Sequence, residues 1–343
     1  MSISQAARIA FVGAGNHATA SLYPNIAHIP EFDLVAVCDI APEKARDAAR
    51  KYGALEWYTD VERMIEQVQP QGICICGPAA MHYEVGMQAL SHGIPIFVEK
   101  PPAPSLAQAQ ALADAARKHA TWGMVGFMKR FAPANVVARE YMATAAFGRL
   151  STITLMHGSG PYEEIRRMLF TNGIHMLDLG RFLAGDVVSV FAYGLHDGAG
   201  VQAVSASFRF ANGAVGQLNM NSGHSWTDCF EMVYLSGTSG GIVIDGSRTT
   251  EVMAPSQRFA EGHGTELFGW SSRYYVSGNM AQWAAGGHYT RGYWGELSHF
   301  ARAVLGMVEP TATLQDGIEA IRLIDGIVDS VECGQPVALT HFR

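Results

Sequence analysis

Short apolar runs alternate with longer helical segments over the N-terminal third of the chain. The runs contain few polar residues, and turn-forming residues bound them. They lie at 7–13, 32–39, 71–77, 94–100 and 121–127. Strands that read as almost continuous apolar runs are typical of a parallel sheet covered on both faces.

The intervals between these runs have helical composition. Each begins near Pro, Asp or Ser, and several end at Gly, as helices commonly do. The segments are 42–53, 60–70, 81–93 and 104–120. Strict alternation of strand and helix predicts right-handed crossovers and a doubly wound α/β sheet.

The pattern changes after a helix expected at about 132–145. From 149 to 255 the runs are rich in β-branched residues and broken by Asn-Gly and Gly-Gly, which predicts hairpins in an open, mostly antiparallel sheet. Two helices, at 293–306 and 313–333, close the chain, and 256–292 reads as irregular. We therefore expect a nucleotide-binding domain at 1–126 and an α+β domain for substrate binding and oligomerisation at 127–343.

Composition narrows the class of protein. A chain of 343 residues has room for two domains, and 24 basic against 31 acidic residues give no sign of nucleic-acid or anionic-membrane binding. The first residues lack the apolar core of a signal peptide, and no run is long and apolar enough to span a bilayer. A cytoplasmic protein is expected.

Cysteine usage fits a reduced protein. Cys74 and Cys76 are two apart in a predicted strand, on one face, where an ordinary disulfide is not expected. A structural zinc site is the alternative, but no second paired spacing accompanies it. Cysteines in apolar runs are more often buried core residues than metal ligands, so no metal is expected.

A glycine-rich turn follows the first predicted strand. The residues are Gly13, Ala14, Gly15, Asn16, His17 and Ala18, and a helical segment starts within them. The first glycine permits a tight turn, and Gly15 lets a pyrophosphate approach backbone N–H groups at a helix N-terminus. A turn with no ligand is the alternative. The context of strand, turn and helix favours the Rossmann dinucleotide site, with Asn16 and His17 beside the cofactor.

Asp39 stands at the end of the second predicted strand. A carboxylate in this place accepts hydrogen bonds from the ribose 2′-OH and repels a 2′-phosphate. The next residue is Ile40 rather than arginine, which favours NAD over NADP. The alternative is that Asp39 only caps the following helix.

Motifs along the whole chain carry a family resemblance. They are Pro78 with His82, the tripeptide Glu99-Lys100-Pro101, 126–134, 172–180, and the closing pattern Thr311, Asp316-Gly317, Ser330 and Gly334. With these motifs the chain resembles the glucose-fructose oxidoreductase and inositol dehydrogenase family (Gfo/Idh/MocA). The resemblance implies NAD(P)-dependent oxidation or reduction of hydroxyl or keto carbons in sugars and cyclitols. It also implies a homodimer or homotetramer formed through the open sheet, and it places Pro78, His82, Glu99 and Arg130 on the cofactor side.

Lys100 is the first candidate catalytic residue. Ligands of doubly wound sheets lie at the carboxyl ends of the strands, and Lys100 stands there, directly before Pro101. An ammonium in this place can hold a substrate hydroxyl or a developing alkoxide. Without the family motif, a solvated lysine is the ordinary alternative.

His175 is the second candidate catalytic residue. If Thr171 or Asn172 caps the helix that runs to about 184, His175 lies in its first turn, where the helix dipole favours a neutral ring. A neutral imidazole can take the hydroxyl proton, and Asp178, three residues on, can orient the ring or contact the substrate. A buried, satisfied histidine is the alternative.

The resemblance has one departure. In the inositol dehydrogenase branch it implies an aspartate four residues before the histidine, and Thr171 stands there. Neither Thr171 nor Asn172 is a base at neutral pH, so a proton relay must be shorter or use water. Asn172 is then a candidate to hydrogen-bond a sugar hydroxyl.

Further residues are candidates for substrate recognition. Lys129, next to Arg130, can approach the substrate, although a basic pair before a helix is usually solvated. Arg166 can bind an acidic group. An aromatic set suits a sugar or aglycone, or else core packing or a dimer contact; it comprises Trp270, Tyr274, Tyr275, Trp283, Tyr289, Tyr293 and Trp294.

Three functions fit these features. The first is an NAD(P)-dependent sugar or polyol dehydrogenase that uses Lys100 and His175. The second is a glycosidase that retains NAD and oxidises the sugar transiently. The third is a nucleotide-sensing protein without turnover, which the presence of both candidate catalytic residues disfavours.

Overall fold

The computed structural model describes residues 6–198, 200–225, 229–253, 271–275 and 289–339. The chain divides into two compact units. Unit 1 comprises Met1–Phe131 and Ala284–Ile321, and unit 2 comprises Ala132–Trp283 and Arg322–Arg343. The first boundary lies close to the expected one at 126, and the segment 284–321 groups with the first unit by its contacts. The expected domains at 1–126 and 127–343 stay a prediction.

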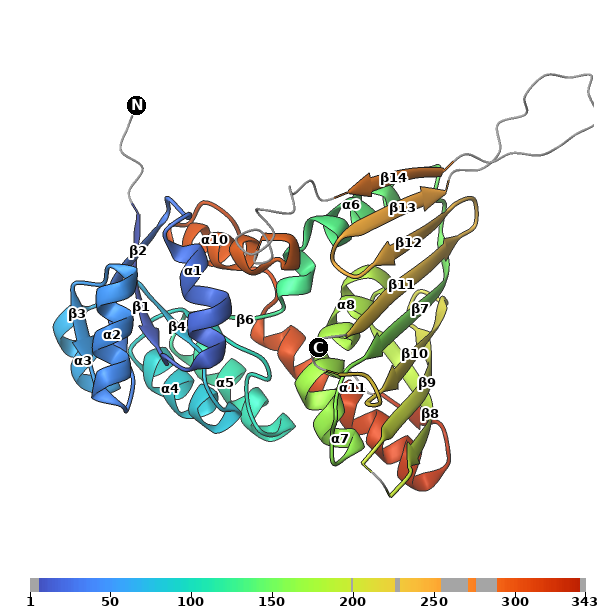
Figure 1. The fold of residues 1–343 in the computed structure, drawn as a ribbon, viewed down its shortest axis with the longest axis horizontal. Coiled ribbons are helices and arrows are strands. Elements are labelled where there is room, and N and C mark those ends of the chain that lie inside the picture. The colour runs from blue at the N-terminus through green and yellow to red at the C-terminus, as the bar shows by residue number, and fades with distance from the viewer. Residues whose placement is uncertain (1–5, 199, 226–228, 254–270, 276–288, 340–343) are drawn as a thin grey trace, which may run out of the picture. The chain divides into compact units, whose positions relative to one another are not determined.

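Unit 1 is built on a six-stranded parallel sheet with the order β3-β2-β1-β4-β5-β6 (Figure 1). The strands are β1 (Ala7–Val12), β2 (Phe32–Cys38), β3 (Glu56–Tyr58), β4 (Gly72–Ile75), β5 (Ile96–Val98) and β6 (Gly123–Val125). This order is that of the Rossmann dinucleotide-binding fold. The expected doubly wound sheet is confirmed. The short edge strand β3 was missed, because Glu56 and Trp57 are exposed and leave no apolar run.

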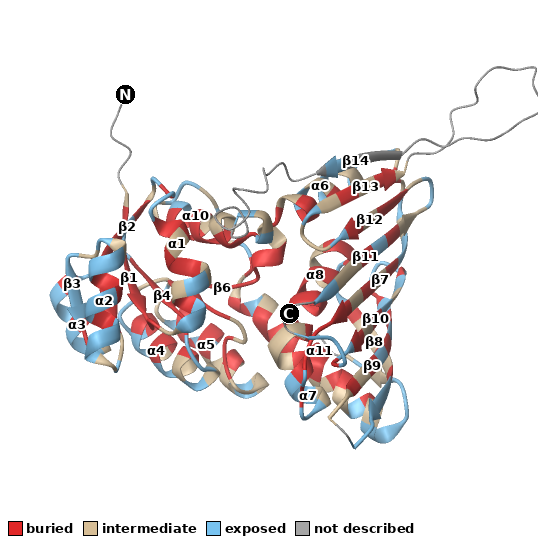
Figure 2. Cartoon of the chain, viewed as in Figure 1, coloured by how far each residue is buried: buried red, intermediate tan, exposed pale blue. Residues whose placement is uncertain are grey.

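Helices connect the strands at the positions that the sequence predicts. They are α1 (Tyr23–Ile26), α2 (Pro42–Tyr52), α3 (Val61–Val68), α4 (Ala79–Ser91) and α5 (Leu106–Lys118). Local signals set their ends: the Asp60 side chain accepts from Arg63 N at the start of α3, and Gly53 ends α2 with a φ of 84°. Apart from the edge strand β3, the strands between them are almost fully buried (Figure 2).

Helix α10 (Tyr293–Val304) explains why the division into units is not continuous in sequence. Its residues Leu297 and Phe300 are fully buried in the same apolar core as Ile9 and Phe11 of β1. Burial of these side chains against the parallel sheet holds the segment in unit 1. Helix α11 (Leu314–Cys333) belongs to unit 1 up to Ile321 and to unit 2 from Arg322.

Unit 2 contains a nine-stranded sheet with the order β14-β13-β12-β11-β7-β10-β9-β8-β15. The strands are β7 (Leu150–Gly158), β8 (Val187–His196), β9 (Gln202–Phe210), β10 (Val215–Asn221), β11 (Phe230–Gly237), β12 (Gly241–Asp245), β13 (Thr249–Met253), β14 (Ser271–Tyr275) and β15 (Val337–Ala338). Among these pairs only β7 and β10 run parallel. The mostly antiparallel sheet is confirmed, whereas β14 lies in a stretch that we wrongly expected to be irregular throughout.

Helices α6 (Pro133–Met142) and α8 (Ile174–Ala184) pack against strands of this sheet, and both lie on one of its faces (Figure 1). Alternate residues of β9 point to that side and are buried: Val204, Ala206, Phe208 and Phe210. The other face carries exposed apolar side chains at Tyr193, Leu195, Phe230 and Tyr234. The sheet is therefore open on one side.

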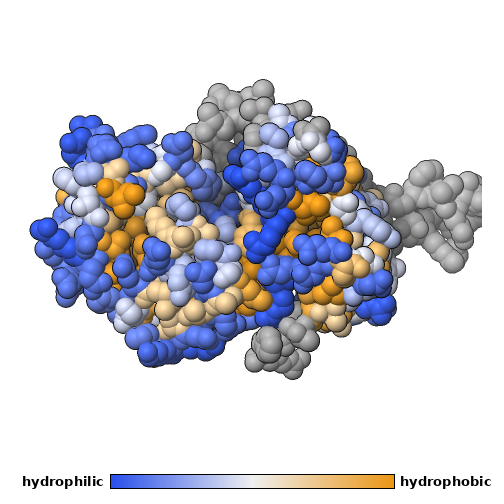
Figure 3. Space-filling view, turned by 90° about the horizontal axis from the view of Figure 1, so that it is seen from below, coloured by the Kyte–Doolittle hydropathy of each residue, from blue (hydrophilic) through white to orange (hydrophobic). Residues whose placement is uncertain are grey.

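Among the described residues, no helix combines the length and apolar character needed to cross a membrane. Figure 3 shows one face of the molecule, on which hydrophilic residues separate small apolar patches. Cys74 and Cys76 are free and buried, and burial raises the pKa of both thiols.

Candidate active site

The glycine turn has the geometry of a phosphate-binding loop. Gly13 has a φ of 103°, and a Cβ there would lie 2.0 Å from the carbonyl oxygen of Cys76. No side chain fits in this place. A Cβ on Gly15 would meet nothing within 4 Å, and the chain is helical from Asn16. The turn therefore leaves space for a phosphate at a helix N-terminus.

The helix after this turn is anchored by residues that the sequence did not single out. It contains a π-helical turn, Ala18–Leu22, before α1. The Tyr23 hydroxyl donates to Gly13 O at 3.1 Å, and the Thr19 hydroxyl donates to Gly15 O at 3.0 Å. Tyr23 is fully buried. In the sequence, Tyr23 reads only as a tyrosine on the inward face of a helix. Such a tyrosine is equally expected from ordinary core packing.

Asp39 contacts both the glycine loop and the residue that precedes α2. Its Oδ2 accepts from Ala14 N at 2.7 Å, and its Oδ1 accepts from Ala41 N, the N-cap position of α2, at 2.9 Å. Because the N-cap residue of α2 is Ala41 and α2 has no side-chain cap hydrogen bond, Asp39 orders the turn before the helix and is not its N-cap. The same carboxylate lies against the glycine loop and has further lone pairs for a ribose hydroxyl. Ile40 beside it is 93% exposed. Glycine loop and carboxylate together fit a dinucleotide.

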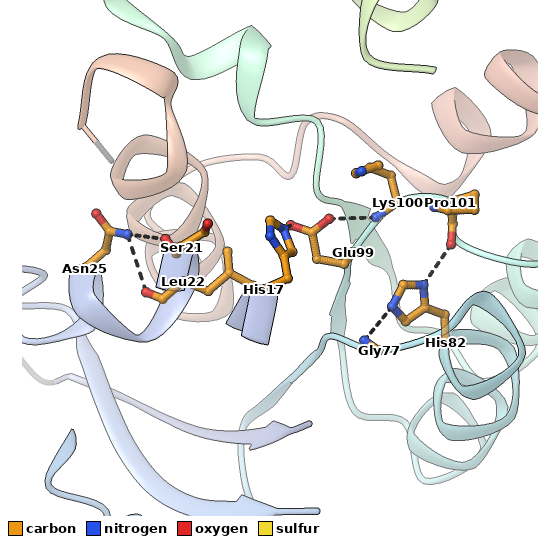
Figure 4. Close-up of polar contacts among 9 residues, drawn as sticks. All are labelled: His17, Ser21, Leu22, Asn25, Gly77, His82, Glu99, Lys100 and Pro101. Atoms are coloured by element: carbon orange, nitrogen blue, oxygen red, sulfur yellow. Dashed lines mark hydrogen bonds and ion pairs between the residues drawn. The ribbon is translucent and has the colours of Figure 1, made fainter. Parts of the chain in front are cut away.

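Glu99 connects the glycine loop to Lys100 (Figure 4). Its Oε2 accepts from Lys100 N at 3.0 Å, and His17 Nε2 lies 3.3 Å from its Oε1. Gly126 leaves room for this carboxylate, because a Cβ there would lie 3.0 Å from Glu99 Cδ. Burial alone raises the pKa of Glu99, but the His17 hydrogen bond and the charges of His17 and Lys100 outweigh it and lower the pKa.

His82 holds the loop that follows Lys100. The Lys100–Pro101 peptide bond is cis, and Pro101 O lies 2.8 Å from His82 Nδ1. Gly77 N donates to His82 Nε2 at 2.9 Å. Nε2 is therefore the acceptor, Nδ1 carries the proton, and burial lowers the pKa of the ring. Both ring nitrogens are used inside the chain, so His82 orders the loop, and its expected place on the cofactor side stays a prediction. Pro78 is exposed at the start of α4.

Lys100 is half-buried at the end of β5. Burial lowers the pKa of its ammonium, and Glu99 opposes that shift. A lysine with a lowered pKa gives up its proton more readily than a lysine in water. Together with its hydrogen-bonded backbone, this suits a group that holds the oxygen of a reacting alcohol or ketone.

Lys129 and Arg130, the basic pair after β6, are largely buried, whereas a basic pair before a helix is usually solvated. Lys129 is only 6% exposed, and Arg130 Nη2 lies 2.9 Å from Asp316 Oδ1. Asp316 Oδ2 also accepts from Thr313 N at 2.8 Å at the start of α11. A Cβ on Gly317 would lie 2.8 Å from Pro102 Cγ. The Asp-Gly pair thus lets α11 approach the Lys100 loop closely.

His175 has a different local setting from the one expected. The chain is helical from Ile165 through α7 (Ile165–Met168), a π-helical turn at Leu169–Gly173 and α8. Thr171 and Asn172 lie inside this helix and cap nothing, so the dipole argument for a neutral His175 is wrong. His175 is 7% exposed and Asp178 is fully buried. A π-turn often marks a functional site.

A chain of polar side chains reaches Asn172 from the sheet of unit 2. Asn172 Nδ2 donates to Ser159 Oγ at 2.7 Å, and His157 Nε2 lies 3.0 Å from the same oxygen. His157 Nδ1 lies 3.9 Å from Glu231 Oε2 on the neighbouring strand. These polar side chains could not be grouped from the sequence, because Ser159 follows β7 in a loop and Glu231 is distant in sequence.

The remaining candidates have structural partners. Arg166 Nη2 lies 3.1 Å from Asp325 Oδ1, and its guanidinium stacks 4.2 Å from the Phe170 ring, so an acidic substrate would have to compete with Asp325. The Tyr293 ring lies 5.9 Å from the His17 ring, and Trp294 donates to His28 O. These two aromatics pack within unit 1. Tyr274 and Tyr289 are exposed, the Tyr275 side chain is not described, and Trp270 and Trp283 lie outside the described residues.

Comparison with known proteins gives family matches to both parts of the chain. Residues 7–127 match the NAD-binding Rossmann fold of an oxidoreductase family. Residues 166–339 match the C-terminal alpha/beta domain of the same family.

Curated relatives and solved structures agree with these matches. The D-glucoside 3-dehydrogenase of Escherichia coli K12 is 30% identical over 52% of this chain and 54% of that protein. The scyllo-inositol 2-dehydrogenase (NAD(+)) of Bacillus subtilis 168 is 25% identical over 93% and 92%. A dehydrogenase structure from Chromobacterium violaceum has a TM-score of 0.83 at 23% identity and covers 96% of each chain. Levoglucosan dehydrogenase with NADH and L-sorbose has a TM-score of 0.82 at 21% identity, over 98% and 100%.

Proposed function

We propose that this chain, which belongs to the Gfo/Idh/MocA family of NAD-binding oxidoreductases, transfers a hydride between NAD and a hydroxyl- or keto-bearing carbon of a sugar, cyclitol or sugar derivative. When bound, NAD supplies the hydride acceptor. The residues of the chain bind the dinucleotide, hold the reacting oxygen and move its proton.

The observation that carries this proposal is the environment of Lys100. Its backbone N–H is fixed by Glu99, the following cis Pro101 is held by His82, and its ammonium has a lowered pKa. All of these lie in unit 1 with the glycine loop. A lysine held this rigidly at the end of a central strand suits an oxygen that gains negative charge as hydride leaves its carbon.

We assign His175 the exchange of the hydroxyl proton. The aspartate of the inositol dehydrogenase branch is replaced by Thr171, so the histidine acts with the neighbouring polar chain of Asn172, Ser159 and His157. Asn172 donates to Ser159 through Nδ2, which leaves Oδ1 as the side-chain acceptor for a second substrate hydroxyl. The arrangement favours a substrate with adjacent hydroxyl groups.

The names of the relatives support this substrate class. Three of the four proteins named above are a D-glucoside 3-dehydrogenase, a scyllo-inositol 2-dehydrogenase and a levoglucosan dehydrogenase. Each name describes oxidation of a cyclic polyol or sugar.

The test is turnover with oxidised NAD and a panel of substrates. The panel contains scyllo-inositol, myo-inositol, methyl glucosides and levoglucosan, and NADH absorbance is followed. We expect turnover with at least one member, with losses of at least about a thousandfold in Lys100→Ala and His175→Ala, since groups of this kind contribute several kcal/mol to the barrier. Turnover undiminished in both variants would refute the assignment. Arg167→Ala, at an exposed residue, is the control.

We also propose that a second copy of the chain covers the open face of the sheet in unit 2. Tyr193 is 69% exposed and Leu195 is 55% exposed on this face, and a cluster of exposed apolar residues on a sheet is typical of an interface. Light scattering should give a mass of two or four chains. Tyr193→Glu should reduce it, and a wild-type mass of one chain would contradict the proposal.

A further inference from the structure

Glu296 is a buried acid for which the proposed reaction has no role so far. It lies on α10 in unit 1, has no exposed surface, and follows Tyr293 by one helical turn. Among the described residues, neither of its carboxylate oxygens has a hydrogen-bond partner. A buried carboxylate without donors is strongly unfavourable in its charged form, and such a group keeps its proton.

The surroundings connect Glu296 to the nucleotide site. Residues three apart share a helix face, so Glu296 lies on the same face of α10 as Tyr293, whose ring meets His17 edge-on. His17 in turn contacts Glu99. The ionisable groups around Glu296 come from β4, from the end of β5, from α10 and from the turn packed against it. They are Cys74, Cys76, Glu99, Lys100 and Tyr293, and Lys129 on the turn acts on Lys100.

These neighbours divide into neutral and charged groups. Burial raises the pKa of Cys74, Cys76 and Tyr293, so all three are neutral near pH 7. The pKa of Glu99 is lowered, which leaves it ionised. Burial raises the pKa of Glu296 well above its usual range; the charge of Glu99 raises it further, and Lys100 opposes this. Of two neighbouring carboxyl groups, one is therefore charged and one is neutral.

We propose that Glu296 is a proton-holding residue of the nucleotide site. It is a neutral acid in the free protein, loses its proton to solvent when a positive charge comes to lie at the Lys100 end of β5, and regains the proton when that charge is removed. The source of the charge is the oxidised nicotinamide, so the inference rests on the proposed function. NADH carries no positive charge on its ring and leaves the proton in place.

The step moves a proton alone. The O–H bond of Glu296 breaks, its electron pair stays on the carboxylate, the proton goes to water, and the carboxylate that forms offsets the incoming positive charge. His17 is 44% exposed and lies 3.3 Å from Glu99 Oε1, so the charged neighbour of Glu296 contacts a side chain that solvent reaches. Glu296 acts through charge and touches no substrate, which makes it a positioning residue.

Infrared spectroscopy of the full chain without nucleotide tests the first half of the proposal. A protonated carboxylic acid has a C=O stretching band distinct from that of a carboxylate. The difference spectrum of wild type minus Glu296→Gln at pH 7 should contain this band. The matched control is Glu319→Gln, at a buried acid of unit 1 that accepts from Gln315, and it should give no such band. A difference spectrum for Glu296→Gln without the band overturns the proposal.

Calorimetry of the wild type tests the second half and does not depend on a variant that folds. Titration with NAD⁺ in two buffers of different ionisation enthalpy should show release of up to one proton per site, and titration with NADH should show none. Equal proton release with both nucleotides overturns the proposal. If neither nucleotide binds, the proposed function fails, and so does the proposed coupling of NAD⁺ binding to proton release. The infrared band still decides whether Glu296 holds a proton.

Discussion

Alanine substitutions at the two loop glycines should have opposite effects. A Cβ on Gly13 would lie 2.0 Å from a backbone oxygen at a φ of 103°, and left-handed strain with overpacking costs about 2–5 kcal/mol. Gly13→Ala should therefore lower the Tm by roughly 5–15 °C for a unit of this size. Gly15 has open space around its Cβ position and no positive φ, so Gly15→Ala should fold normally or gain about 0.4–1 kcal/mol.

Binding should separate the two variants further. The methyl group of Gly15→Ala occupies the space in which a pyrophosphate meets the backbone N–H groups, and a lost charge-assisted hydrogen bond costs about 1.5–3 kcal/mol. We therefore expect the Kd for NAD⁺ to rise roughly 10- to 100-fold. Differential scanning fluorimetry gives the Tm, and calorimetry gives the Kd. Wild-type NAD⁺ affinity in Gly15→Ala, or wild-type stability in Gly13→Ala, would refute the reasoning.

Three further substitutions test the surrounding contacts. Asp39→Asn should raise the preference for NADP over NAD roughly 10-fold or more, because the charge that repels a 2′-phosphate is removed; unchanged Kd values for both nucleotides would count against the ribose contact. The pKa of His82 is lowered, so the unfolded chain binds more protons, and the stability of the protein falls as the pH drops below about 6.5. His82→Ala should destabilise the protein at pH 8 by about 1–3 kcal/mol and make its Tm less dependent on pH below about 6.5. A Tm that matches the wild type at every pH would contradict this. Arg130→Met and Asp316→Asn should each destabilise unit 1, with a combined loss smaller than their sum; strict additivity in urea unfolding would argue against the ion pair.

The strands of unit 1 could be predicted because burial on both faces leaves unbroken apolar runs, and the glycine turn was recognisable because its conformation excludes side chains. The division into units could not be predicted. It depends on the packing of Leu297 and Phe300 in the same core as β1. The sequence pattern of a helix shows that it has an apolar face, but not which sheet that face packs against.

The site around His175 shows the same limit. Thr171 and Asn172 have the composition of a helix cap, but tertiary packing continues the helix back to Ile165 with a π-turn between. The polar chain through Ser159 joins segments that are distant in sequence. In contrast, Lys100 was identifiable because its strand end and Pro101 are both local signals.

Isotope tracing shows whether hydride passes directly from the substrate carbon to the nicotinamide. A polyol that the enzyme oxidises is labelled with deuterium on its carbinol carbon and incubated with oxidised NAD, and the nucleotide is analysed by mass spectrometry and NMR. Direct hydride transfer predicts one deuterium at C4 of the nicotinamide in each NADH formed. Release of the label to water, or cleavage of a glycoside without net NADH, would contradict the account.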